Sequence, residues 1–292
     1  MASARYTTVR RRRLASELKR MRTEAGLTGE QVAERLSQLG GRWSHTKVSR
    51  IETGQVSVNH GDVSDLLDLY GVTDERSRQE LVQIARESGK KGWWHSYSDV
   101  TPQRISPYLD FEATAESMKI FQGQVLPGLV QTEGYARAVI ASVLPDSPAE
   151  EISRTVELRL ARQQVLTRDV PLQLWAILDE AALHRTVGGI PVMRKQLHRL
   201  AEMASMPNIT VQIVPFGAGE HPGMDSPFTI LEFPDSADPD VVYLEHLLST
   251  VYLEKHDEVK RYSLFFDHLR AAALNPKESS QMITAVAEGL QS

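Results

Sequence analysis

The chain has 292 residues, of which 41% are hydrophobic and 24% charged, and its formal net charge is −5. This length predicts about two domains and is enough for a large core. The chain has no cysteine, which excludes disulfides, zinc–thiolate sites and thiol redox chemistry. We expect a cytoplasmic protein without a membrane segment, because no apolar region follows the basic N-terminus and no apolar run reaches the roughly 18 residues that span a bilayer.

Positive charge is concentrated near the N-terminus. Residues 1–61 hold 12 Lys and Arg against 5 Asp and Glu, a balance of +7, so the rest of the chain carries −12. Such asymmetry is typical of a nucleic-acid-facing end on an acidic protein. The arginines at 10–13 lead into an amphipathic helix, and we expect Arg11, Arg12 and Arg13 to contact DNA phosphates, which adds affinity but no sequence choice. The alternative is an ordinary solvated run of charge.

Two short helices joined by a turn are predicted within Leu27–Gly54. Thr28 is followed three residues later by Gln31, the arrangement of a capping box. Apolar residues at helical spacing then continue to Leu39, and Gly40-Gly41 ends this first helix.

Ser44 can cap the second helix, in which Val48 and Ile51 point inward. The polar residues left on its outer side are His45, Thr46, Lys47, Ser49 and Arg50. Nearly all of these side chains can donate a hydrogen bond. A short helix that is polar outside and anchored by two aliphatic residues suits the major groove of DNA.

The string SHTKVSRIETG, preceded by LTGEQVAERL, closely resembles the helix-turn-helix of the Cro and lambda-repressor-like (Xre) class. The resemblance implies that the second helix is the recognition helix, and that Glu52 and Gly54 close it structurally. The residues assigned to DNA in and around this motif are Thr28, Gln31, Arg42, Ser44, His45, Thr46, Lys47, Ser49 and Arg50. The chain departs from the pattern at Gly29, where a polar residue is usual, and in a long turn from Ser37 to Arg42. The alternative is a helical hairpin with a solvated face.

Two more helices are predicted after this motif, over 62–70 and from 74 to about 85. Five helices then make an all-α domain over residues 1–88. The segment 89–107 is rich in Gly, Ser and Pro and is expected to be a linker.

The remainder, 108–292, mixes helical and alternating patterns, which predicts an α+β domain and an α+β chain overall. Helices are expected over 110–121, 132–144, 147–167, 180–187, 192–206 and 254–274. Alternating strands are expected over 172–178, 209–214, 228–233, 241–245 and 249–253.

Four strings in this region carry a second resemblance: VLPGLVQTEGYARAV, LQLWAILDEAALHRTVGG, LAEMASMPNITVQIVPFGAGEHPGMDSPFTILEF and VVYLEHLLSTVYLE. They resemble the C-terminal domain of antitoxin-like regulators common in actinobacteria. That family joins such a domain to a Xre-type N-terminus, and the gene often neighbours one for a small partner protein. The resemblance implies regulation of transcription, with sensing or partner binding in the C-terminal part.

The C-terminal region offers few residues for chemistry. Glu180 and His184 share a helix face, but spacing supplies no third metal ligand. The Gly- and Pro-rich loop 217–227 carries Glu220, His221 and Asp225, which we single out as ligand-binding or partner-binding residues, against the alternative of a plain surface turn. No motif of an enzyme class is present, so we expect no catalysis, no cofactor and no metal.

Two functions are favoured over a third, an enzyme with a DNA-binding tether. The first is a sequence-specific regulator that binds double-stranded DNA, is controlled through its C-terminal domain by a small-molecule effector, and forms a homodimer because one short recognition helix reads only a few base pairs. The second is an antitoxin-like protein that chiefly sequesters a small protein partner. An enclosed pocket favours a small molecule, whereas an exposed apolar groove favours a protein.

Overall fold

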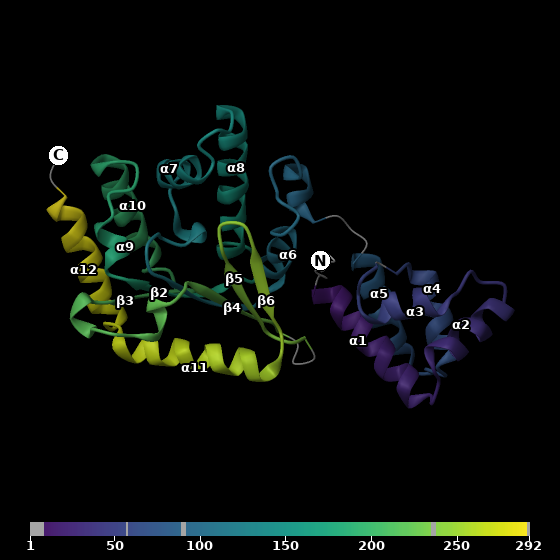
Figure 1. The fold of residues 1–292 in the computed structure, drawn as a ribbon. Coiled ribbons are helices and arrows are strands. Elements are labelled where there is room, and N and C mark those ends of the chain that lie inside the picture. The colour runs from purple at the N-terminus through teal and green to yellow at the C-terminus, as the bar shows by residue number, and fades with distance from the viewer. Residues whose placement is uncertain (1–8, 57, 89–91, 235–237, 291–292) are drawn as a thin grey trace. The chain divides into compact units, whose positions relative to one another are not determined.

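A computed structural model describes residues 9–56, 58–88, 92–234 and 238–290. The chain divides into two compact units between His95 and Ser96. This division falls inside the expected linker 89–107, of which residues 89–91 lie outside the described part. Each unit is considered by itself below (Figure 1).

The N-terminal unit is a bundle of helices (Figure 1). Its described helices are α1 (Val9–Glu24), α2 (Gly29–Gln38), α3 (His45–Glu52), α4 (His60–Leu69) and α5 (Glu75–Ser88). They are the five predicted from apolar periodicity, and each gives side chains to one core. Fully buried members include Leu14, Leu18, Val32, Leu36, Val48, Ile51, Val63, Leu66, Leu67 and Leu81. A short 3-10 helix, η1 (Trp93–Tyr97), follows.

The C-terminal unit is built on one sheet of six strands in the order β3-β2-β1-β4-β5-β6. The strands are β1 (Ser117–Gln122), β2 (Gln173–Asp179), β3 (Ile209–Val214), β4 (Phe228–Glu232), β5 (Val241–Glu245) and β6 (Thr250–Leu253). β1, β2 and β3 run parallel, while β4, β5 and β6 are added antiparallel. The predicted α+β class is therefore confirmed, with a mixed sheet.

Helices cover both faces of this sheet (Figure 1). They are α6 (Ser106–Thr114), α7 (Glu133–Val143), α8 (Ala149–Arg162), α9 (Ala181–His184), α10 (Ile190–Met203), α11 (His256–Ala272) and α12 (Pro276–Gly289). α11 crosses one face, where Phe266 and Leu269 pack against Ile177, Ile230 and Val242. α7 to α10 lie on the opposite face, and α12 lies beside β3. No helix of the described residues is both long and apolar enough to cross a membrane.

The prediction of a helix over 110–121 is wrong in its second half. α6 ends at Thr114, and β1 begins three residues later. β1 is central: it pairs with β2 on one side and β4 on the other. Phe111, Ala115 and Met118 have helical spacing by coincidence, because Met118 and Phe121 are buried by cross-strand partners that the local sequence does not reveal.

One expected helix is shorter than predicted, and one helix was not expected. The helix expected over 180–187 is only the single turn of α9, since Gly188 and Gly189 follow with φ of +72° and +86°. α12 was not predicted, although Asn275 and Glu278 form a capping box at its start. Its packing on β3 and α10 makes it part of the core of this unit.

Candidate nucleic-acid interface

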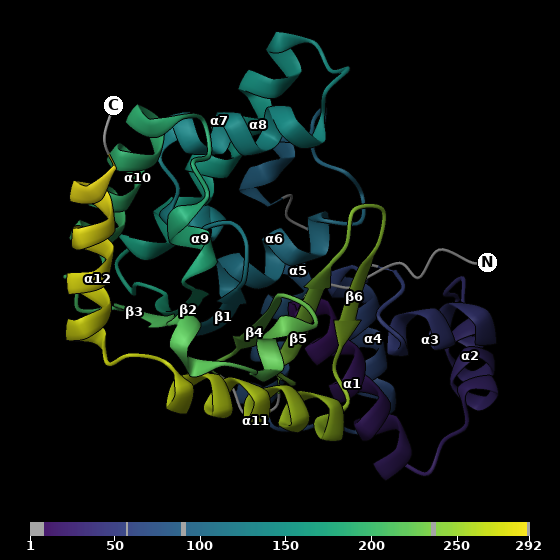
Figure 2. The same ribbon diagram turned by 60° about the vertical axis from the view of Figure 1, so that its left-hand side comes forward.

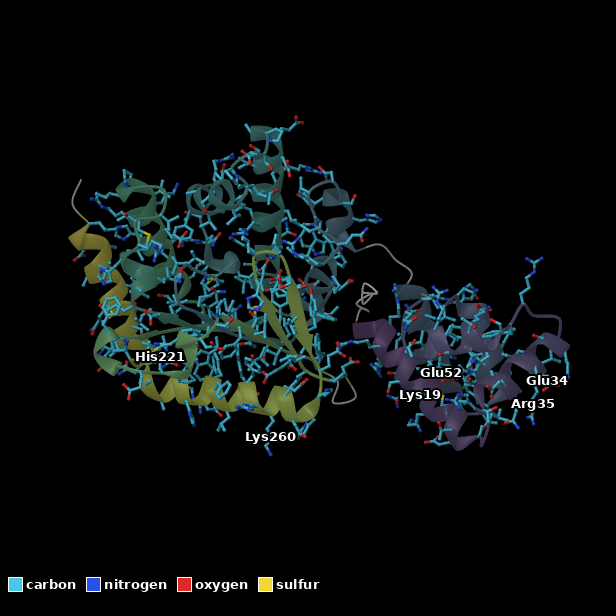
Figure 3. All side chains as sticks on the ribbon, in the orientation of Figure 1. Lys19, Glu34, Arg35, Glu52, His221 and Lys260 are labelled. Atoms are coloured by element: carbon cyan, nitrogen blue, oxygen red, sulfur yellow. The ribbon has the colours of Figure 1, made fainter. Side chains whose placement is uncertain are left out.

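α3 is fastened to α1 by a largely buried ion pair between Arg22 and Glu52; Glu52 is labelled in Figure 3. Arg22 donates from Nε to Glu52 Oε1 at 2.7 Å and from Nη2 to Glu52 Oε2 at 2.9 Å. Its Nη1 donates to the carbonyl oxygen of Leu27 at 2.7 Å. The hydrogen bond to Glu52 raises the pKa of Arg22 above its usual value. Glu52, only 7% exposed in its side chain, therefore fixes the helix rather than facing solvent.

The outer face of α3 is polar and available. His45, Thr46, Ser49 and Arg50 are exposed, and none of their side chains has a hydrogen-bond partner among the residues described. They form two adjacent rows at i, i+4 spacing. Ser44 caps the helix, accepting a hydrogen bond on Oγ from the Lys47 N–H at 3.1 Å. A rigid helix thus presents four unengaged polar side chains in one patch.

Lys47 differs from these neighbours, because its ammonium group already has partners. Nζ lies 2.9 Å from Asp62 Oδ2 in the first turn of α4 and 4.0 Å from the centre of the Trp43 ring. The side chain is held against the domain. Its assignment to DNA stays a prediction.

The long turn between α2 and α3 is packed rather than loose. Trp43 lies over Gly41, where an added Cβ would come within 2.5 Å of the ring. Ser37 Oγ donates to the Trp43 carbonyl at 3.2 Å, and Gly40 reverses the chain with φ of +90°. Arg42 is exposed at this turn. The extra residues therefore form a structured connection.

Thr28 and Gln31 form the predicted capping box of α2. Thr28 N–H donates to Gln31 Oε1 at 2.8 Å, and Gln31 N–H donates to Thr28 Oγ1 at 3.2 Å. Between them, Gly29 lies against α3: a Cβ at this position would be 3.0 Å from His45 Cδ2. Glycine thus makes room for the His45 ring, which gives a physical reason for the departure noted at this position.

Arg11, Arg12 and Arg13 lie within α1 and are partly buried. Arg13 forms an ion pair with Glu80 of α5. From Arg13 to Arg22, where α3 is attached, the distance along α1 is about 14 Å. These arginines therefore lie toward the other end of α1 from that contact, and their binding to phosphate stays a prediction.

In the C-terminal unit, His221, labelled in Figure 3, connects the loop 217–227 to Asp179 at the end of β2. Its Nδ1 accepts the Gly223 N–H at 3.2 Å, so Nε2 is the protonated nitrogen and donates to Asp179 Oδ2 at 3.1 Å. Asp179 also accepts the Ala181 N–H on Oδ1 at 2.8 Å. The His221 side chain is 6% exposed. Both ring nitrogens are therefore engaged, which leaves none for a ligand.

The other candidate residues of this loop differ from His221 in their exposure. Glu220 and Asp225 are exposed. Burial, and then the charge of Asp225, raises the pKa of Tyr262. Among the residues described, no three His, Asp or Glu side chains gather as a metal site would require.

Glu180 and His184 also serve the structure around this loop. Glu180 Oε1 lies 3.3 Å from His184 Nε2, and Oε2 accepts the Phe216 N–H at 2.7 Å. The His184 ring stacks on Phe216, with centres 5.8 Å apart.

A charged cluster that was not predicted from the sequence surrounds Glu112, whose side chain is 1% exposed. Arg162 donates to it from Nε at 2.8 Å and from Nη2 at 2.7 Å. Arg159, one turn earlier on α8, donates from Nη1 to Gln131 Oε1 at 3.1 Å. The one available signal was the density of arginine on the predicted helix 147–167.

The bundle and the polar face of α3 define a helix-turn-helix protein. Comparison with known families agrees, since a model described as a helix-turn-helix domain matches residues 13–81. A second model, described as a domain of unknown function (DUF5753), matches residues 105–285, which is more than half of the chain. The chain belongs to the DUF5753 family. Neither the curated proteins nor the solved structures gave a match. A helix-turn-helix domain indicates a DNA-binding regulator.

Proposed function

We propose that this protein is a sequence-specific transcriptional regulator that reads the major groove with α3 and receives a signal through its C-terminal unit. The observation that carries the proposal is the contrast between the two sides of α3. On the inner side, Val48 and Ile51 are buried and Glu52 is held by Arg22. On the outer side, four polar side chains have no partner among the residues described.

The buried inner side of α3 fixes the position of its polar outer side. A recognition helix discriminates bases only when its side chains are held in a fixed geometry. Because α3 is clamped at Glu52 and capped at Ser44, Arg50 and Thr46 start from fixed backbone positions. Arginine is suited to a bidentate contact with guanine, worth about 1–3 kcal/mol of discrimination.

The test begins with selection of duplexes from a random library by the full chain, followed by titration of the enriched site. Replacing Arg50 with Ala should cost about 1–3 kcal/mol on that site and relax one base position. Arg86→Ala, an exposed arginine of α5, is the matched control and should change neither quantity. Equal loss by Arg50→Ala on selected and random duplexes would contradict base reading by this residue.

We further propose that the regulator acts as a homodimer, since the eight residues of α3 cover only part of a typical operator. The β5–β6 hairpin projects from the C-terminal unit (Figure 2), and its turn is a candidate contact between copies. It carries Leu247 and Leu248, which are 75% and 87% exposed, where hairpin turns usually place Asn or Gly. Two exposed leucines at a projecting turn are typical of an interaction surface.

The antitoxin-like function remains as the second candidate. Phe216 and Met224, 61% and 72% exposed on either side of Glu220, offer an apolar surface to a protein partner. Copurification with the full chain from its host, compared with a Phe216→Asp/Met224→Asp variant, tests it. A small protein retained by the native chain and lost by the variant would favour sequestration.

A catalytic role finds less support. The Asp179 and His221 side chains resemble an acid–base pair, but each is committed to loop contacts by the hydrogen bonds described above. We propose that the C-terminal unit binds rather than catalyses.

A further inference from the structure

Two arginines in the last turn of α8 lie side by side. Arg159 and Arg162 both extend past Gly128 of η2 (Gly128–Val130), since a Cβ at Gly128 would lie 3.6 Å from Arg162 Nη1 and 3.8 Å from Arg159 Cδ. Part of this arrangement is explained by the helix, because cations near a C-terminus are favoured by the helix dipole. That effect is small and does not require two partly buried guanidinium groups.

Arg162 is neutralised by a carboxylate. Its Nε and Nη2 form one edge of the guanidinium, and this edge takes both oxygens of Glu112. Arg22 uses the same edge for Glu52 in the N-terminal unit. Both pairs have the parallel two-point geometry that suits an arginine to carboxylate and phosphate groups.

Arg159 has the same edge unoccupied. Nη1 is anchored on Gln131 Oε1, and Gln131 is itself fixed because its Nε2 donates to the Leu126 carbonyl at 2.7 Å. Nε and Nη2 of Arg159 have no hydrogen-bond partner among the residues described. Neither nitrogen is fully buried. The edge is therefore held in place, without a partner in the described part of the chain, and is not completely sealed from solvent.

The charge of this cluster is also unbalanced. Arg159 and Arg162 face one buried carboxylate, Glu112, and Arg159 forms no ion pair within the described part of the chain. Burial, and then the neighbouring Arg162, lowers the pKa of Arg159 to about 10. Glu245 opposes this effect from β5, yet it lies beyond ion-pair distance. A partly buried cation without a counter-ion is costly, and an anion that binds beside it relieves the cost.

We propose that the Nε/Nη2 edge of Arg159 is a binding site for the carboxylate or phosphate group of a small anionic ligand. Arg162 adds electrostatic attraction for the bound anion, while Glu112 holds Arg162 in place. The site lies in the C-terminal unit and goes beyond the proposed reading of DNA. Its test uses no DNA, so the two proposals fail separately.

The experiment measures the Tm of the full chain with inorganic phosphate or acetate, each added at tens of millimolar against sodium chloride of equal ionic strength. The native chain should gain about 3–6 °C when the favoured anion is tenfold above its Kd. Phosphate acting alone, acetate acting alone, or both acting would each identify the group that the site accepts. No gain with either would overturn the proposal.

Three variants distinguish anion binding at Arg159 from other causes of a rise in Tm. Arg159→Met should lose the anion response and keep or raise the Tm without anion, because it removes an uncompensated cation. Arg162→Met should lower the Tm, because it leaves Glu112 buried without its partner. Arg199→Met, on the basic face of α10 beside Lys195 and His198, controls for adventitious phosphate binding and should keep the response.

Two results with these variants would overturn the proposal. The first is an anion response that survives in Arg159→Met. The second is a loss of Tm in Arg159→Met as large as that in Arg162→Met, since it would show that Arg159 serves only the fold.

Discussion

The Arg22–Glu52 pair offers a sharp test of how α3 is held. Glu52→Gln keeps the size of the side chain but removes the charge that faces Arg22, whose side chain is 17% exposed. Breaking a buried pair from one side costs about 3–5 kcal/mol. Since Arg22 is partly exposed and keeps its hydrogen bond to Leu27 O, we expect about 2–3 kcal/mol. For a unit of this size that is a fall of at least 8 °C in Tm.

Calorimetry of the full chain should show this fall in the transition of the N-terminal unit. The matched control is Arg20→Met on the same helix, which breaks two ion pairs, to Glu17 and Glu24. Arg20 is 51% exposed in its side chain, so its loss should cost under about 1 kcal/mol.

The same pair predicts a pH dependence. The pKa of Arg22 is raised in the folded state, so its contribution is fully present below the ordinary arginine pKa and is lost only as pH rises through the still higher folded value. As far as the ionisation of Arg22 is concerned, the difference in free energy of unfolding between the native and Glu52→Gln chains should therefore be constant from about pH 6 to 9. A loss of stability in Glu52→Gln no larger than that in Arg20→Met would show that the Arg22–Glu52 pair does not hold α3 in place.

Three other predictions follow from local contacts. Gly29→Gln should displace the His45 ring and weaken binding to the selected site about tenfold, measured by titration, whereas unchanged binding would show that this close approach is unimportant. A Leu247→Asp/Leu248→Asp variant should sediment as a monomer at micromolar concentration, and an intact dimer would exclude the hairpin turn as the contact. His221→Ala should speed proteolysis within 217–227 without changing binding to bare DNA, because it releases the loop from Asp179; unchanged cleavage would contradict this role.

Local sequence signals predicted the N-terminal unit well. Helix caps such as Thr28 with Gln31, and apolar residues at helical spacing, are set by contacts within a few residues. Apolar and β-branched residues between turn signals likewise predicted β2 to β6, although β6 is less buried than the others.

The failures come from contacts distant in sequence. β1 is a strand because β2 and β4 flank it, and its six residues carry no turn signal that separates them from α6. The pairing of Glu112 with Arg162 joins positions 50 apart, which no spacing rule reaches. The start of α12 is different, since the Asn275-Pro276 pair with Glu278 is a local helix signal that is visible in the sequence.

The central claim is that α3 reads base sequence, and one titration tests it most directly. The full chain is titrated at a fixed salt concentration on its selected duplex and on a shuffled duplex of the same composition. Specific readers bind their sites about a thousandfold or more tighter than other DNA, and this protein should do the same. Equal affinity for both duplexes would show that the helix-turn-helix holds DNA through its phosphates alone, and the proposed function would be wrong.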